Sequence, residues 1–65
     1  MNTLQPGQAF KARSGFILTI EAIQDGAASA RVTYPDGERE SLLIALDEWP
    51  WIVETEGLIS AGLAG

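Results

Sequence analysis

Residues 16–37 read FILTIEAIQDGAASARVTYPDG, which contains two runs of β-forming residues, each followed by a turn signal. The first run, residues 16–23, is rich in apolar and β-branched side chains, as strands usually are. The second run, residues 28–34, alternates apolar with polar side chains, which indicates a strand with one buried face. Gly26 and Gly37 accept the positive φ that tight turns require. The stretch therefore predicts a β-hairpin that leads into a further strand.

The alternation also predicts which side chains of the first strand share a face. One face carries Phe16, Leu18, Ile20 and Ala22. Ile17 and Ile23 lie on the other face, so we expect both faces to be partly covered, as in a small closed barrel.

Two further strands are expected outside this stretch. Residues 8–12 alternate weakly and follow a lead-in, residues 1–7, that we expect to be loosely ordered. Residues 38–46 alternate more clearly. In that strand Leu42, Ile44 and Leu46 point to one side, and Arg39, Ser41 and Leu43 point to the other. The tail, residues 58–65, carries no charge. We expect it to be loosely ordered and frayed at its end, with Leu58 and Ile59 able to dock on the core.

Residues 47–53, DEWPWIV, allow two interpretations. One starts a short helix near Asp47, with Pro50 inside its first turn. The other makes residues 47–50 a single helical turn and residues 51–55 a fifth strand. Proline disfavours the helical conformation of the residue before it, which slightly favours the second interpretation.

These segments resemble a small SH3-like barrel over about residues 4–56. The resemblance rests on close strand spacing, on the turns at residues 25–26 and 35–37, and on the proline and aromatics of residues 47–54. The pattern is similar to short SH3-like accessory proteins of phages and mobile elements. It implies one mainly β domain, an antiparallel and partly open barrel of four or five strands with a helical turn near residues 47–50. The acidic loop and paired aromatics of eukaryotic SH3 domains are missing, so proline-peptide recognition is not expected.

The charge of the chain is unevenly distributed. Four basic residues face nine acidic ones, which gives a net charge of −5. Residues 36–65 carry one basic and seven acidic residues, a net charge of −6, whereas residues 1–35 carry three basic and two acidic residues, a net charge of +1. A protein that binds DNA or RNA directly needs several Lys or Arg residues to neutralise phosphates. We therefore expect neither a nucleic acid nor an anionic membrane as a partner.

The composition argues against catalysis. The chain has no cysteine and no histidine, so it lacks the usual nucleophile, general base and metal ligands. The acidic clusters lack the ligand number of a calcium loop, and no phosphate-binding loop is present. We expect no enzyme activity, no cofactor and no metal. No signal-peptide pattern or apolar run of bilayer length appears, and the absence of cysteine fits a cytoplasmic protein.

The two tryptophans are the strongest candidates for binding. Trp49 and Trp51 would lie about 200° apart on a helix, at about 100° per residue. Across a break at Pro50 they could point the same way, but a core this small would struggle to bury both. We therefore predict that one is buried and the other is at least partly exposed; the alternative is that both plug the end of the barrel. Acidic neighbours would surround the exposed indole. An aromatic anchor with a polar rim is typical of interface hot spots. Such a surface suits a basic protein partner.

The resulting hypothesis is a small acidic binding protein that occupies the basic, nucleic-acid-binding surface of a host complex. A phage-encoded inhibitor, of which anti-CRISPR proteins are an example, would be of this type. In a strand Glu38 and Glu40 lie about 6.7 Å apart on one side, so a row of carboxylates could imitate the phosphates of DNA. They lie on the same side of the strand as Leu42 and Ile44. They must therefore lie beyond the core, unless a bulge intervenes. The expected contact residues are Asp36, Glu38, Glu40, Asp47, Glu48, Trp49, Trp51, Glu54 and Glu56.

An alternative is a structural or self-associating interaction module. A chain of 65 residues buries only about 60% of its unfolded surface and has marginal stability. The apolar tail residues Leu58, Ile59 and Leu63 could then mediate association. The chain would be a monomer or a weak homodimer.

Overall fold

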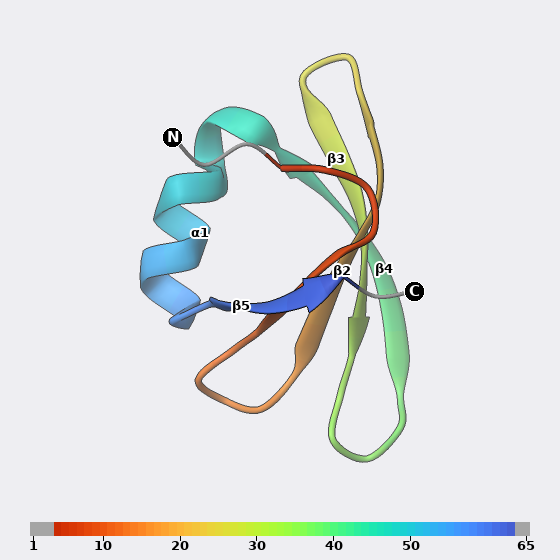
Figure 1. The fold of residues 1–65 in the computed structure, drawn as a ribbon, viewed down its shortest axis with the longest axis vertical. Helices are drawn as coiled ribbons and strands as arrows, with labels where there is room; N and C mark the ends of the chain where they lie inside the picture. The colour runs from red at the N-terminus through yellow and green to blue at the C-terminus, as the bar shows by residue number, and fades with distance from the viewer. Residues whose placement is uncertain (1–3, 64–65) are drawn as a thin grey trace.

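The computed structural model describes residues 4–63 and folds them into one antiparallel sheet with a short helical segment (Figure 1). The elements in chain order are β1 (Gln8–Lys11), β2 (Ile17–Gln24), β3 (Ala27–Thr33), β4 (Arg39–Ala45), the 3-10 helix η1 (Leu46–Glu48), α1 (Trp49–Glu56) and β5 (Ile59–Leu63). The prediction of a mainly β, antiparallel and partly open fold is confirmed.

The sheet has the strand order β4-β3-β2-β1-β5. β1 to β4 are consecutive neighbours, whereas β5 returns across the molecule to pair with β1. The sheet does not close, so β4 and β5 are its two free edges. α1 lies on one side of the sheet (Figure 1), and no helix in residues 4–63 has the length and apolarity to cross a bilayer.

The β2–β3 turn has the geometry that its sequence predicts. Asp25 and Gly26 adopt φ values of 53° and 78°. Positive φ at both central residues is the signature of the type I′ turn, whose twist matches that of the flanking strands. This turn therefore sets the register of the central hairpin.

The fifth strand and the helix differ from the favoured interpretation. Residues 51–55 are helical, so the expectation of a strand there is wrong and the interpretation with a helix from near Asp47 is correct. Pro50 lies in the first turn of α1, where a missing N–H costs no helical hydrogen bond. The fifth strand is formed by Ile59–Leu63 instead, within the tail that was expected to be loosely ordered.

The segments at both ends of the described chain contact the sheet. Before β1, Leu4 packs against the core and the Gly7 N–H donates to the Ile20 carbonyl at 2.7 Å. After α1, Leu58 is buried, as expected, but Ile59 is 65% exposed. The expectations for residues 1–3 and 64–65 lie outside the described residues.

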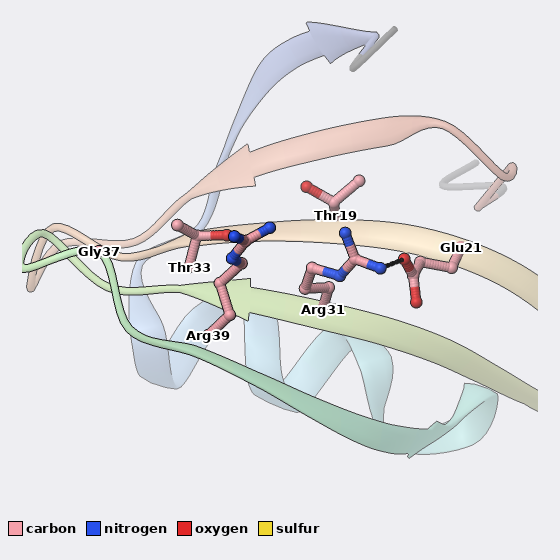
Figure 2. A pocket seen from close by; sticks show the side chains of 6 residues that line it. All are labelled: Thr19, Glu21, Arg31, Thr33, Gly37 and Arg39. Atoms are coloured by element: carbon pink, nitrogen blue, oxygen red, sulfur yellow. Dashed lines mark ion pairs between the residues drawn. The ribbon is translucent and has the colours of Figure 1, made fainter.

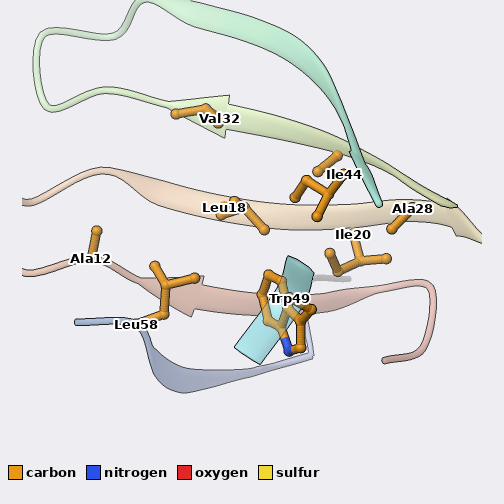
Figure 3. Close-up of a cluster of buried hydrophobic side chains, with 9 residues drawn as sticks. Ala12, Leu18, Ile20, Ala28, Val32, Ile44, Trp49 and Leu58 are labelled. Carbon is orange, nitrogen blue, oxygen red and sulfur yellow. The ribbon is translucent and has the colours of Figure 1, made fainter. Parts of the chain in front are cut away.

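The core fills the space between the sheet and α1 (Figure 3). Its buried members are Ala12, Leu18, Ile20, Ala28, Ala30, Val32, Ile44, Trp49 and Leu58. Ala28 and Ala30 of β3 are fully buried within it. On β4, Ile44 is buried as predicted, whereas Leu42 on the same side is 38% exposed. Leu42 lies on an edge strand with a neighbour on one side only.

A bulge in β2 changes the face assignment of its last residues. The register against β3 shifts between Ile20 and Ala22. Beyond this point Ala22 is exposed, while Ile23 lies opposite Ala28 and packs against the core. The prediction that Ala22 shares a face with Ile20 and that Ile23 lies on the other face is therefore wrong. An extra residue in one strand turns every following side chain to the opposite face.

Candidate functional site

Most of the predicted contact residues lie on the continuous helical segment formed by η1 and α1. Gly57 ends α1 with a φ of 64°, and its N–H donates to the Val53 carbonyl, as in a left-handed C-cap. A Cβ on Gly57 would lie 2.9 Å from Nε and Nη2 of Arg13. The Arg13 guanidinium therefore covers the helix C-terminus, where positive charge is favourable. This end of the helix is fixed to the β1–β2 turn.

The two tryptophans face opposite sides of α1. Trp49 is 4% exposed, and its ring meets Phe10 edge-on with ring centroids 5.0 Å apart. Trp51 is 67% exposed. The prediction that one tryptophan is buried and the other is exposed is confirmed. Trp49 was expected among the contact residues, but its side chain belongs to the core and leaves almost no surface for a partner.

Acidic side chains surround Trp51 on the exposed side of the helix. Residues three and four positions apart share a helix face. The members of this set are Asp47 and Glu48 before Trp51, and Glu54 and Thr55 after it, and all are exposed. No ion pair within residues 4–63 involves their carboxylates. We call Asp47, Glu48, Trp51, Glu54 and Thr55 the Trp51 face.

The acidic residues at the two ends of the helix have opposite effects on its stability. Asp47 and Glu48 lie at the helix start, where negative charge is favourable. Glu54 and Glu56 lie in the last turn, which has no basic residue of its own, and there negative charge opposes the helix dipole. Glu56 lies about 140° around the helix from Trp51, at about 100° per residue. A contribution to helix stability therefore does not explain the presence of Glu54 on the Trp51 face.

The remaining acidic candidates lie at the β3–β4 turn and take part in local hydrogen bonds. Asp36 Oδ1 accepts from the Glu38 N–H at 2.9 Å. Glu40 Oε1 accepts from the Tyr34 hydroxyl at 2.6 Å. This hydrogen bond, with smaller effects of desolvation and of the Glu40 charge, raises the pKa of Tyr34 above its ordinary value. Glu40 is exposed, although it lies opposite the buried Val32 near the start of β4.

The structure separates the predicted contact residues into two groups. The turn group, Asp36, Glu38 and Glu40, precedes or begins β4, and the helical group follows the other end of that strand. β4 runs from residue 39 to residue 45, which spans about 20 Å at about 3.3 Å per residue. The turn group and the Trp51 face are therefore distinct surfaces.

Basic side chains gather on the sheet face opposite α1 (Figure 2). A shallow pocket of about 450 Å³ on this face is lined by Thr19, Glu21, Arg31, Thr33, Gly37 and Arg39. Arg31 Nη2 forms an ion pair with Glu21 Oε2 at 2.7 Å. Lys11 lies on the same face, because β1 pairs it with Ile17. The pocket offers hydrogen-bond donors from two guanidinium groups and two hydroxyls, one guanidinium being partly neutralised.

This basic face was not among the surfaces predicted from the sequence. The alternation in residues 28–34 and 38–46 could have indicated this face. It places the odd-numbered residues, among them Arg31, Thr33 and Arg39, on the side away from the core. Their proximity depends on the strand register, which pairs Thr33 with Arg39 and Arg31 with Ser41. The sheet face opposite α1 therefore carries Lys11, Arg31 and Arg39 together with Glu21, whereas the charged residues of η1 and α1 are all acidic.

Comparison with known proteins adds no family to this description: no protein-family model, curated protein or solved structure matched the chain. Within residues 4–63, no group of three or more acidic side chains is arranged to hold a metal ion.

Proposed function

We propose that the chain is a binding protein that docks on a basic protein surface through the Trp51 face. The observation that supports this most strongly is Trp51, which is 67% exposed on a rigid helix. Interface hot spots are enriched in tryptophan and are surrounded by contacts that exclude water. The acidic rim repels acidic surfaces and attracts basic ones, which increases the rate of productive encounter.

The partner is best described as a protein with a nucleic-acid-binding surface, because such surfaces are the most strongly basic ones. Occupying that surface would inhibit the partner, in the manner expected of a small phage-encoded inhibitor. The contact is centred on the helix and not on the turn group. Two of the turn carboxylates, Asp36 and Glu40, already accept hydrogen bonds within the fold, whereas those of the Trp51 face form no ion pair within residues 4–63.

The proposal is tested by capturing partners from a lysate with tagged wild-type protein and with Trp51→Ala. A captured basic protein is then purified, and its affinity is measured for each variant across a salt series. We expect Trp51→Ala to weaken binding by about 30-fold or more, because hot-spot truncations exceed about 2 kcal/mol. Added salt should also weaken binding, since the rim charges are exposed.

Two matched variants serve as controls. Leu43→Ala removes another exposed apolar side chain, 75% exposed, from the opposite side of the molecule, and should leave the affinity unchanged. Glu38→Gln removes one acidic charge from the turn group and should have a smaller effect than Glu54→Gln. Equal binding by wild type and Trp51→Ala, or a larger effect of Glu38→Gln than of Glu54→Gln, would contradict the proposed surface.

A further inference from the structure

The pocket on the sheet face opposite α1 is built from side chains of three neighbouring strands (Figure 2). The strand register pairs Thr19 with Arg31 and Thr33 with Arg39. Directly opposite residues have Cβ atoms about 4.5–5.5 Å apart. Arg31 is opposite Ser41, so Arg39 is its diagonal neighbour, with the two Cα atoms about 7–8 Å apart. Both guanidinium groups can therefore reach one small group that binds between them.

The positive charge of Arg39 is not balanced on this face. Within residues 4–63 Arg39 forms no ion pair, although acidic residues flank it in the sequence. Successive side chains of a strand point to opposite faces, so Glu40 points away from the pocket. Glu40 instead accepts a hydrogen bond from the Tyr34 hydroxyl at 2.6 Å. The exposed guanidinium of Arg39 is therefore available to a negatively charged ligand.

Arg31 is held over the same pocket by Glu21. Glu21 is the extra residue of the β2 bulge, where the register against β3 shifts between Ile20 and Ala22. Bulges re-aim side chains and are over-represented beside functional sites. Glu21 Oε2 lies 2.7 Å from Nη2 of Arg31, and a guanidinium has further N–H donors that this ion pair does not use. The pocket therefore combines two positive charges with one negative charge, a net charge of +1.

Two threonine hydroxyls complete the set of donors. Thr19 and Thr33 line the pocket and are partly buried. In the part of the chain that the structure describes, neither hydroxyl forms a hydrogen bond with another protein group. Each hydroxyl can donate one hydrogen bond, and a guanidinium donates several in a planar fork that fits phosphate and carboxylate groups. The donors of the pocket therefore suit an anion with several acceptor oxygens.

We propose that this pocket binds the phosphate group of a small molecule, either free phosphate or a phosphate monoester, through Arg31, Arg39, Thr19 and Thr33. A phosphate monoester carries a charge of about −1.5 to −2 at pH 7 and presents three acceptor oxygens. These match the two guanidinium groups and the two hydroxyls. Lys11 lies on the same face and adds a third positive charge outside the pocket, which favours a doubly charged ligand over a singly charged one.

The charge of the whole chain favours a small phosphate compound over a nucleic acid. Nucleic-acid binding requires Lys or Arg residues that neutralise several phosphates, and the basic face has three. The net charge of −5 repels a polyanion more strongly than a single phosphate group. Binding should be weak and should weaken further with salt, because the guanidinium groups are exposed. The pocket shares no residue with the Trp51 face, so this inference does not depend on the proposed function.

The first test is a titration of the isotope-labelled chain with phenyl phosphate at constant ionic strength, followed by amide chemical shifts. We expect saturable shifts at the residues of the pocket. Arg39→Gln should weaken binding by about tenfold or more, because hydrogen bonds between charged groups are lost. Lys11→Gln removes the same charge from the same face but outside the pocket. It should weaken binding by about twofold at most, since salt screens charges that do not contact the ligand. Equal losses from the two variants, or no saturable shifts in the wild type, overturn the inference.

Two conservative variants test the geometry of the donors. Arg39→Lys keeps the charge but removes the planar fork and should weaken binding several-fold. Thr33→Val keeps a β-branched side chain of similar shape but removes the hydroxyl, and it should also weaken binding several-fold. Circular dichroism verifies that each variant folds, and Arg39→Lys replaces Arg39→Gln in the first test if the latter does not. Wild-type affinity in both conservative variants contradicts a pocket built from these donors.

Glu21→Gln tests the role of Arg31 by an expected gain of affinity. The Glu21 carboxylate competes with the ligand for Arg31 and repels an anion. Its neutralisation should therefore strengthen binding of phenyl phosphate several-fold. An unchanged or lower affinity would mean that Arg31 does not contact the ligand, which overturns a site with two arginines.

Further probes identify the ligand class. Tighter binding of inorganic phosphate than of phenyl phosphate would identify free phosphate as the ligand, and the reverse order a monoester; both results support the inference. Phenylacetate, with one negative charge, should bind several-fold more weakly than phenyl phosphate, and equal binding overturns the assignment to phosphate. A single-stranded oligonucleotide that binds more tightly than phenyl phosphate would assign the face to nucleic acid instead. Trp51→Ala should leave phosphate binding unchanged, which separates this result from the proposed function.

Discussion

On the inner side of α1, Trp49 is 4% exposed and packs against Phe10, whereas on the outer side Trp51 is 67% exposed. The two residues have the same side chain and are separated by one proline. Trp49 lies among the residues that connect the helix to the sheet. Trp51 lies among carboxylates that form no ion pair within residues 4–63, and one of them opposes the helix dipole. Trp49 is therefore explained by the stability of the fold. Trp51 and its acidic neighbours are not, which makes them the candidates for function.

The largest effect that sharpens this comparison is expected from Trp49→Ala. Removing a buried tryptophan costs about 3–5 kcal/mol, and a domain of this size has only about 3–10 kcal/mol of stability. We expect the variant to be largely unfolded at room temperature, or to unfold at a much lower urea concentration. Trp51→Ala should change the free energy of unfolding by about 0.5 kcal/mol or less. Urea titrations followed by far-ultraviolet circular dichroism measure both, and equal losses would remove the distinction between the two faces.

An intermediate effect is expected at Gly57, which holds the helix in the orientation that separates its two faces. Gly57→Ala introduces a side chain at a φ of 64° and places its Cβ 2.9 Å from the Arg13 guanidinium. Left-handed conformation alone costs a non-glycine residue about 1–2 kcal/mol. We expect a loss somewhat above that range in urea titrations.

Gly26→Ala is a suitable control for this variant. Gly26 also has a positive φ, of 78°, but no atom lies within 4 Å of an added Cβ. Most of the difference between the two variants therefore comes from the contact with Arg13. If Gly57→Ala were no more destabilising than Gly26→Ala, Arg13 would simply move aside and would not fix the helix end.

The amphipathic alternation made most of this fold predictable. The strands at residues 16–23 and 28–34 and the turn at Asp25 and Gly26 follow from local sequence, because side-chain parity and turn chemistry are local properties. One buried and one exposed tryptophan were expected from helical geometry and from the small size of the core. These features need no knowledge of distant contacts.

The wrong predictions concern features that depend on contacts between residues far apart in the sequence. The bulge at Glu21 has no local signal, since it depends on how β2 fits β3. β5 has a weak β pattern and forms because β1 offers it a free edge. The split of the acidic residues into two surfaces follows from the length and direction of β4, which charge counts along the chain do not contain. The local effect of Pro50 was misjudged, because proline also suits the first turn of a helix.

The smallest effect, and the one most specific to the outer side of the helix, is expected at Glu54. Its carboxylate lies in the last helical turn, where negative charge is unfavourable by about 0.3–1 kcal/mol. Glu54→Gln should therefore stabilise the protein slightly, while Asp47→Asn at the helix start should destabilise it slightly. Both variants should weaken binding to a basic partner, because both remove charge from the Trp51 face. Opposite changes in urea stability with parallel losses of affinity would show that Glu54 serves recognition at the expense of the fold. A Glu54→Gln variant that binds as tightly as the wild type would place this residue outside the contact.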